Sequence, residues 1–371
     1  MISTDVKLKQ MFLRKNIGAK REKQYINVLS EIYEITGKTP IQLIDEAKEE
    51  EQPYIVNGMP RIKDIDDRKL TNYFYIYYKS LLDKKLNNST IDFKLKSLRA
   101  FYNEHSITLP KPIKIDIPIK VIREGDIPNI DDIRKGYMNA TTLRNKALIL
   151  FMASTGIRSS DVRNFKVSDF TKATKEYHNS DSIEDLLDGN YYKKVIPCWD
   201  FTPQKTRKAG NICMTFNTPE ATESIINYLK TRNNLQEDDY LFISQYKRQI
   251  GSHGIIWMFK ELNDRHFHRN DEGNRFFHAH AMRKFFISTV KHYTSDYKKS
   301  KILSGHAISK IEIAYEEIKK DVMKEFYCQL IPHLSIRDTK VHTMKSKEYL
   351  ELENKLNQQI EENRLLAEKL G

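Results

Sequence analysis

Residues 142–161 read TLRNKALILFMASTGIRSSD. The apolar run from Thr142 to Ser154 predicts a helix, and the glycine at position 156 predicts its end, because glycine readily takes the left-handed conformation that closes helices. Arg158 and Asp161 follow that glycine. On a helix, their i, i+3 spacing would make the two side chains neighbours. The segment is therefore compatible with a functional site, and equally with a structural ion pair.

A β-hairpin is expected further along the chain. Strand-like runs at 191–201 and 211–216 lie on either side of a turn segment at 203–210. The turn carries Lys205, Arg207 and Lys208. Lysines on a hairpin turn often serve solubility, so this piece alone indicates no function.

Two more segments carry histidines and a second arginine. The sequence HAMR at 280–283 leads into an apolar stretch, and a helix there would place His280 and Arg283 on one face. The sequence LSGH at 303–306 is followed, nine residues after its histidine, by Tyr315. Together the four pieces supply a tyrosine that can act as a nucleophile and several cations that can surround it.

In their order along the chain, these pieces resemble the motifs of the tyrosine recombinase or phage integrase family. That family has an arginine in T-G-x-R-x-x-E/D, a hairpin lysine, H-x-x-R, G-H and a tyrosine, and this chain has all of them between Thr155 and Tyr315. The surroundings of GH at 305–306, AY at 314–315 and PHL at 332–334 resemble integrases of archaeal and bacterial mobile genetic elements. Lys284 and Glu312 depart from the pattern, outside the catalytic positions.

The resemblance implies a catalytic set and a role for each member. The set consists of Arg158, Lys205, His280, Arg283, His306 and the nucleophile Tyr315, with Asp161 in a supporting position. Lys205 would protonate the leaving 5′ oxygen, His306 would donate a hydrogen bond to the phosphate, and His280 would serve as a base or an orienting group. Lys208 stays an alternative to Lys205, because both lie in the same turn.

The chemistry of strand transfer explains this combination. Attack of Tyr315 on a backbone phosphate builds negative charge on phosphorus, which Arg158 and Arg283 would hold through paired hydrogen bonds. We therefore expect a site-specific DNA recombinase or integrase that cleaves and rejoins DNA through a 3′-phosphotyrosine intermediate. Since the guanidiniums neutralise the charge and the phosphotyrosine keeps the energy of the broken bond, neither a metal nor ATP nor another cofactor is expected.

The composition agrees with a DNA partner. Lysine and arginine outnumber aspartate and glutamate by 62 to 50, and the formal net charge of +12 suits a polyanion such as double-stranded DNA. The three cysteines show no C-x-x-C spacing, and no stretch approaches the roughly 18 apolar residues of a membrane span. We expect a cytoplasmic, nucleoid-associated protein without a membrane partner, and the resemblance implies a homotetramer on DNA.

The predicted fold is mainly α-helical with a small β-sheet. Two apolar helix faces are expected before the linker: Leu70, Phe74, Tyr77 and Leu81, then Ile91, Leu95, Leu98 and Tyr102. Prolines after position 108 interrupt the helical pattern. The expected parts are a helical DNA-binding (core-binding) domain at 1–108, a linker at 109–122, a tyrosine-recombinase catalytic domain at 123–337 and a C-terminal amphipathic or coiled-coil helix at 338–371.

Other readings of the same residues stay open. Candidate metal ligands cluster at His266, His268, His278 and His280, with Asp264 and Asp271 nearby. A type IB topoisomerase-like enzyme would use the same tyrosine chemistry to relax DNA. A catalytically silent DNA-binding protein derived from an integrase would keep the fold without the reaction. Tyr327 is the next candidate nucleophile after Tyr315.

Overall fold

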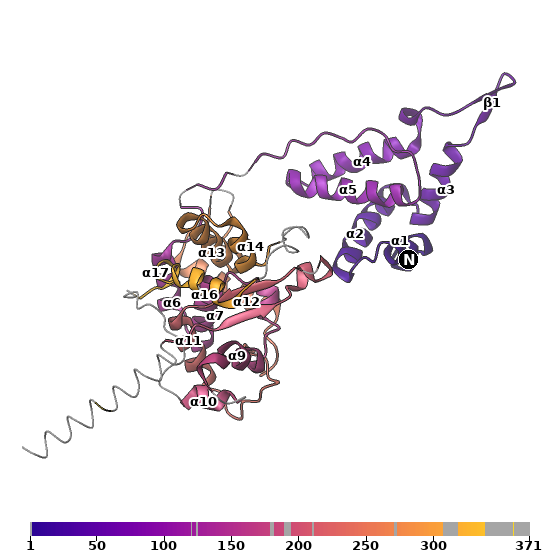
Figure 1. Cartoon of the computed structure of the whole chain (residues 1–371). Helices are drawn as coiled ribbons and strands as arrows, with labels where there is room; N and C mark the ends of the chain where they lie inside the picture. Colours follow the sequence, from indigo (N-terminus) through magenta and orange to yellow (C-terminus); the bar gives the residue numbers. More distant parts are fainter. Residues whose placement is uncertain are drawn as a thin grey trace, which may run out of the picture. The chain divides into compact units, whose positions relative to one another are not determined.

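The chain forms two compact units, Met1–Val121 and Ile122–Gly371, which are called unit 1 and unit 2 (Figure 1). The computed structural model describes residues 2–119, 121–123, 125–178, 182–188, 194–209, 211–270, 273–306 and 318–337, together with Gln359. Helices dominate both units, and the strands form two small antiparallel sheets of two strands each. The predicted fold class, mainly α with a small sheet, is confirmed.

Unit 1 is a helical unit with its own apolar core. Its elements are η1 (Ile2–Thr4), α1 (Val6–Arg14), α2 (Ala19–Thr36), α3 (Pro40–Glu50), β1 (Tyr54–Val56), β2 (Met59–Arg61), η2 (Ile65–Asp67), α4 (Lys69–Asp83) and α5 (Asn88–Glu104). All eight residues of the two predicted apolar faces are buried, on α4 and α5 respectively. The helical periodicity of the sequence was therefore a correct guide to the core of this unit.

A β-hairpin in unit 1 was not predicted. Strands β1 and β2 pair in register from Tyr54↔Arg61 to Val56↔Met59, and the turn between them is Asn57-Gly58. Both turn residues have positive φ angles, 53° and 77°, as the two-residue turns that match the twist of paired strands require. The hairpin is attached to the helices at its base, where Lys63 forms an ion pair with Glu50 at 2.7 Å.

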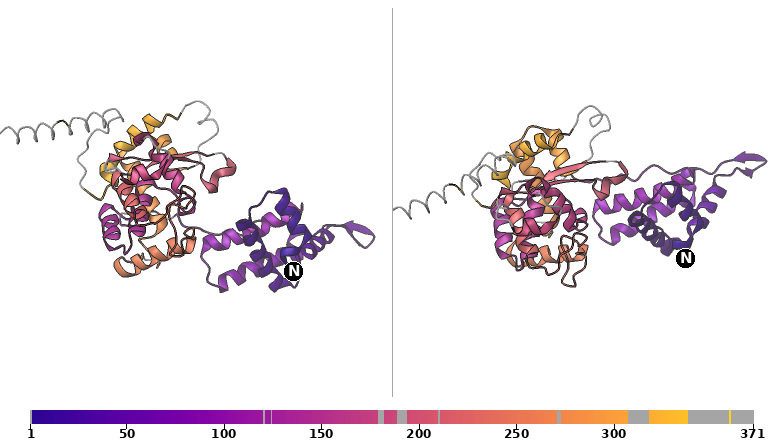
Figure 2. Two further views of the ribbon diagram at one scale, coloured as in Figure 1. Left: turned by 90° about the horizontal axis from the view of Figure 1, so that it is seen from below. Right: turned by 60° about the horizontal axis from the view of Figure 1, so that its bottom comes forward.

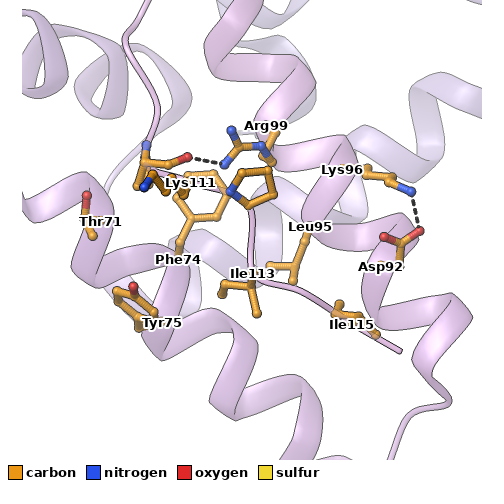
Figure 3. Close-up of a pocket in the computed structure, with 12 residues that line it drawn as sticks. Thr71, Phe74, Tyr75, Asp92, Leu95, Lys96, Arg99, Lys111, Ile113 and Ile115 are labelled. Carbon is orange, nitrogen blue, oxygen red and sulfur yellow. Dashed lines mark hydrogen bonds and ion pairs between the residues drawn. The ribbon is translucent and has the colours of Figure 1, made fainter. Parts of the chain in front are cut away.

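The first part of the linker is bound to unit 1. Residues 110–116 are here called the strap, and five of them, Pro110, Lys111, Pro112, Ile113 and Ile115, line a groove together with residues of α4 and α5 (Figure 3). Ile113 and Ile115 pack against the core of the unit, and Arg99 on α5 donates from Nη1 to the Pro110 carbonyl at 2.8 Å. Asn88 donates to the carbonyl of Asp116 at 2.8 Å. Beyond the strap the chain is exposed, as the 91% exposure of Ile119 illustrates.

The strap gives a testable prediction. A carboxylate at position 113 would have to leave water to keep the strap in place, so Ile113→Asp should release it. We expect trypsin to cleave after Lys114 several-fold faster in this variant than in the original chain, because proteases cut locally opened segments. Ile119→Asp, which changes an exposed isoleucine, is the matched control. Equal cleavage rates in all three proteins would show that the strap is not held.

Unit 2 is built around helix α7. Its helices are α6 (Ile130–Asn139), α7 (Leu143–Thr155), α8 (Ser159–Val162), α9 (Val167–Thr174), η3 (Lys175–Tyr177), α10 (Ile183–Asp188), α11 (Pro219–Leu229), α12 (Ser252–His266), α13 (Ala279–Tyr293), α14 (Tyr297–Ser304), α16 (Lys320–Cys328) and α17 (Ile331–Leu334). Every residue of α7 from Ala147 to Thr155 is buried, and α6, α11 and α13 pack on it. The side chain of Thr142 caps its first turn by accepting from the Asn145 backbone N–H.

The predicted hairpin of unit 2 exists but its strands are shorter than expected. Strands β3 (Cys198–Phe201) and β4 (Cys213–Phe216) pair from Cys198↔Phe216 to Phe201↔Cys213. A 3₁₀ helix, η5 (Gln204–Ala209), forms most of the connection. Figure 2 shows this hairpin with its connection projecting from the body of unit 2. The pairing therefore covers four residues of each expected run, 198–201 and 213–216.

The chain after α14 contributes to the core of unit 2. Buried side chains of α16 and α17 include Met323, Phe326, Tyr327 and Leu334. The predicted C-terminal helix at 338–371 lies outside the described residues except for Gln359, which is helical. Among the helices that the structure describes, none combines the length and the apolar character needed to cross a membrane.

Candidate active site

Two arginines from distant parts of the sequence bind the glycine turns at which two helices end. Gly156 closes α7 with φ 65°, and Arg283 on α13 donates from Nη1 to its carbonyl oxygen at 2.6 Å. Gly305 closes α14 with φ 57°, and Arg158 donates from Nη1 to its carbonyl oxygen at 3.2 Å. Each turn thereby connects one predicted catalytic segment to another.

Both glycines are required by space as well as by conformation. A Cβ atom at position 156 would lie 2.2 Å from Cδ1 of Phe286. A Cβ at position 305 would lie 3.0 Å from both the Cβ of Cys213 and the Cγ of Pro203, at the end of the β3–β4 hairpin next to its connection. Burial raises the pKa of the Cys213 thiol to about 12, so it fills this space as a neutral group. The hairpin therefore packs directly against the Gly305 turn.

Asp161 ties the hairpin to the first arginine segment. Its side chain is only 4% exposed, and Oδ1 accepts a hydrogen bond from the backbone N–H of Gln204 at 3.0 Å. Among the described residues it forms no ion pair with Arg158, contrary to the neighbouring pair that the i, i+3 spacing suggested. Arg158 is the N-cap of the four-residue helix α8, and its guanidinium binds Gly305 instead.

The charges in this region are poorly compensated within the chain. Within the described part of the chain, Nη2 of Arg283 and Oδ2 of Asp161 are both buried and have no hydrogen-bond partner. Burial and the nearby charge of Arg158 lower the pKa of Arg283 to about 10, which leaves it protonated at neutral pH. Burial raises the pKa of Asp161, although the Gln204 N–H and the two arginines oppose this. The unpaired donor belongs to the Arg283 guanidinium, and the Arg158 guanidinium is close to it. Two such cations favour an anionic ligand such as a phosphate.

His306 lies in the same positive environment. Burial and the charges of Arg283, Arg158, Lys291 and Lys301 lower its pKa to about 4. Its Nδ1 lies 2.9 Å from Oγ of Ser304, and its backbone N–H donates to the Lys301 carbonyl. The imidazole is therefore neutral near pH 7 in the absence of an added anion.

Lys205 and His280 lie at exposed positions. Lys205 follows Gln204 in η5, so the Asp161 hydrogen bond holds the residue just before it. His280 lies in the first turn of α13, one turn before Arg283, and burial and Lys284 lower its pKa. The structure thus binds Arg158 to the Gly305 turn, Asp161 to the hairpin connection and Arg283 to the Gly156 turn. The side chain of Lys208 is not among those described.

The two candidate tyrosines differ in what the structure describes. Tyr315 lies within 307–317, outside the described residues. Tyr327 on α16 is fully buried, and its hydroxyl donates to the Ser154 carbonyl at 2.8 Å. Burial also raises its pKa well above that of a free phenol. Tyr327 is therefore a core residue, and its use as an alternative nucleophile is not supported.

The histidine cluster has structural partners. Asp264 forms ion pairs with Arg269 at 3.1 Å and Arg275 at 2.9 Å. His268 stacks on Phe276 with the ring centres 4.4 Å apart. Within the described ranges, no group of three or more histidine, cysteine or acidic side chains is arranged to hold a metal ion. The described residues therefore give the metal-site alternative no support.

Sequence reasoning missed three contributors to this region. These are the Gln204 backbone N–H, the Cys213 side chain and Ser304. Ser304 directly precedes the GH motif, so the sequence alone could have indicated that it lies close to His306. The other two depend on how the hairpin folds onto the glycine turn, which no local pattern reveals.

Comparison with known proteins agrees with this geometry. Residues 120–321, more than half of the chain, match the phage integrase family, and the chain belongs to this family. It is 22% identical over 289 residues to the tyrosine recombinase XerC of Staphylococcus carnosus, covering 73% of this chain and 84% of that protein. It is 23% identical over 256 residues to XerD of Oceanobacillus iheyensis, covering 67% and 77% respectively.

Solved structures show the same fold. The Tn1549 transposon integrase in complex with circular intermediate DNA aligns with a TM-score of 0.50 at 14% identity, covering 87% of this chain and 98% of that one. The XerH recombinase bound to its difH substrate aligns with a TM-score of 0.50 at 17% identity, covering 84% of each chain. At these identities the likeness concerns the fold.

The glycine turn of α7 gives a stability prediction. Gly156→Ala adds both a positive-φ penalty and a collision with Phe286, so we expect it to lower the free energy of unfolding of unit 2 by about 2–4 kcal/mol. Gly273→Ala is the control, since Gly273 has φ 75° and nothing within 4 Å of its added Cβ. It should cost only about 1 kcal/mol. Urea unfolding followed by tryptophan fluorescence measures both, because Trp199 and Trp257 lie in unit 2. An equal loss of unfolding free energy in the two variants would show that the Phe286 ring moves aside at little cost.

Proposed function

We propose that this member of the phage integrase family is a site-specific DNA recombinase that cleaves and rejoins DNA through a 3′-phosphotyrosine on Tyr315. The observation that carries the proposal is the pair of guanidiniums bound to the Gly156 and Gly305 carbonyls, with Nη2 of Arg283 buried and unpaired among the residues that the structure describes. A scissile phosphate would supply the missing acceptor. Arg158 and Arg283 would then stabilise the charge that develops as the phosphorus becomes pentacoordinate.

The remaining residues divide the proton transfers. Lys205 would protonate the 5′ oxygen as it leaves, and Asp161 would position that lysine through the Gln204 N–H. His280, exposed near Arg283, would orient the phosphate or the nucleophile. Because fixed cations neutralise the transition state and the phosphotyrosine bond keeps the energy for rejoining, the reaction would need neither a metal nor ATP.

The proposed partner is double-stranded DNA, on which the chain would assemble as a homotetramer and associate with the nucleoid. The net charge of +12 supports a polyanionic partner. Unit 1 would serve as a core-binding domain and unit 2 as the catalytic domain, a division supported by the position of the family match, which covers only residues 120–321.

Removing one oxygen tests the nucleophile. Tyr315→Phe should abolish the covalent adduct with a nicked target DNA while leaving DNA affinity nearly unchanged, because only the attacking atom is lost. Tyr327→Phe is the matched control: it loses a buried hydrogen bond worth about 1 kcal/mol but should still form the adduct. Adducts are detected as DNA that stays bound to protein under denaturing conditions. An adduct formed by Tyr315→Phe would refute the assignment.

Chelation tests the role of the arginines. Cleavage should proceed at an unchanged rate in EDTA, because Arg158 and Arg283 would provide the charge neutralisation that metal ions supply in many nucleases. The measurement is the rate of adduct formation before and after chelation. Loss of cleavage that is restored by magnesium or zinc would contradict this mechanism and revive the histidine cluster.

A further inference from the structure

The β1–β2 hairpin of unit 1 carries exposed apolar side chains. Figure 1 shows it extending beyond the helices of the unit, and residues 53–62 are here called the arm. Tyr54, Ile55, Met59 and Ile62 are between 48% and 69% exposed. Within the part of unit 1 that the structure describes, no arm side chain packs on the apolar core or forms a hydrogen bond or ion pair. The arm therefore adds little to the stability of the unit and is available to a partner.

Prolines make the arm a poor partner for another β-strand. Ile55 pairs with Pro60, and Val56 pairs with Met59 beside the two-residue turn. The pair next to such a turn is hydrogen-bonded and pairs alternate, so the backbone groups of Ile55 and Pro60 point out of the ribbon. Pro60 has no N–H to offer there, and Pro53, which precedes β1, has none either. A strand of another chain that extends this sheet is therefore not the expected occupant.

The charge of the arm suits a polyanion. Arg61 is its only charged residue, and it is exposed. Acidic side chains start behind the base of the arm, where Glu50 is paired with Lys63 at 2.7 Å and three aspartates within 64–67 are exposed. A phosphate backbone would be attracted by Arg61 and repelled by these aspartates. Contact with a nucleic acid would therefore be limited to the arm itself.

The arm has the dimensions of a ligand for the major groove of DNA. Strands of three residues that rise about 3.4 Å per residue are about 10 Å long. The major groove is about 12 Å wide and about 8.5 Å deep, and it admits a two-stranded ribbon. The tip would reach the base edges while the aspartates behind the base stay outside the groove. The minor groove, about 6 Å wide, would first have to be deformed.

One face of the arm matches the groups that line this groove. Successive residues of a strand point to opposite faces and paired residues share a face, which groups Tyr54, Val56, Met59 and Arg61 together. Ile55 and Pro60 lie on the opposite face. The first face thus combines a cation with apolar side chains. In the major groove, thymine presents an apolar methyl group beside the anionic backbone.

We propose that the arm binds in the major groove of duplex DNA, with the Met59 side chain against a thymine methyl group and Arg61 on a phosphate. This rests on the DNA partner of the proposed function and on none of its chemical steps. It assigns to unit 1 a contact that depends on base sequence, because only thymine carries the methyl group. The phosphate contact fixes the arm in the groove without reading sequence.

Uracil in place of thymine tests the methyl contact, because uracil lacks only that group. The full-length chain is titrated with a duplex of alternating adenine and thymine and with its uracil counterpart. We expect about fourfold weaker binding to the uracil duplex, the effect of one buried methyl group. Met59→Thr should bind both duplexes equally. Ile55→Thr is the matched control, because Ile55 is 69% exposed, Met59 is 67% exposed and the two lie on opposite faces, so it should keep the fourfold preference.

The salt dependence of the same binding tests the phosphate contact. Arg61→Gln should lower the slope of log affinity against log salt concentration by about one, and Arg61→Lys should keep the slope. Unchanged methyl preference in Met59→Thr, or an unchanged slope in Arg61→Gln, would overturn the proposal. A lower molecular mass of Met59→Thr in sedimentation without DNA would also overturn it, since a second copy of the chain would then be the occupant.

The outcome is separable from that of the recombinase function. Adduct formation by the wild-type chain on nicked DNA is measured beside the titrations. An adduct without any methyl preference would refute the arm contact alone. A methyl preference without an adduct would support the arm contact and refute the cleavage chemistry alone.

Discussion

The site depends on two hydrogen bonds, from Arg283 to the Gly156 carbonyl and from Arg158 to the Gly305 carbonyl. The last carbonyls of a helix have no partner within the helix and carry its partial negative charge. The two arginines satisfy these groups at the ends of α7 and α14. One pair of interactions thus completes two helices, joins three sequence segments and places two cations together, so the fold and the site cannot be optimised separately.

The charges near this site remain without ion-pair partners because of how the side chains are placed, although an acid, Asp161, is nearby. Asp161 is buried nearby, yet it accepts a hydrogen bond from the Gln204 N–H. Among the described residues, its Oδ2 and Nη2 of Arg283 have no hydrogen-bond partner. Buried groups of this kind destabilise a fold. A direct ion pair would relieve them but would occupy the guanidinium. Without that ion pair, burial and the charge of Arg158 lower the pKa of Arg283, and its Nη2 remains available to an acceptor.

The sequence predicted what depends on local periodicity and chain order. Helix α7 and the glycine at its end followed from residues 142–156, and the ordered motifs indicated the family. The hydrogen-bond partner of Asp161 was not predicted, because helical spacing considers only neighbours in one short helix, whereas the Gln204 N–H belongs to the hairpin connection. The β1–β2 hairpin was missed although Asn57-Gly58 between apolar residues is a turn signal.

The strap changes how the linker should be understood. Prolines marked residues 109–122 as one linker, but Ile113 and Ile115 pack on unit 1 and Asn88 holds the carbonyl of Asp116. Six residues, 117–122, remain before or at the start of unit 2, and at full extension they span at most about 20 Å. Release of residues 110–116 would roughly double that reach. Since the strap is held by two isoleucines and two side-chain hydrogen bonds, its attachment sets how far apart the units can move without unfolding either one.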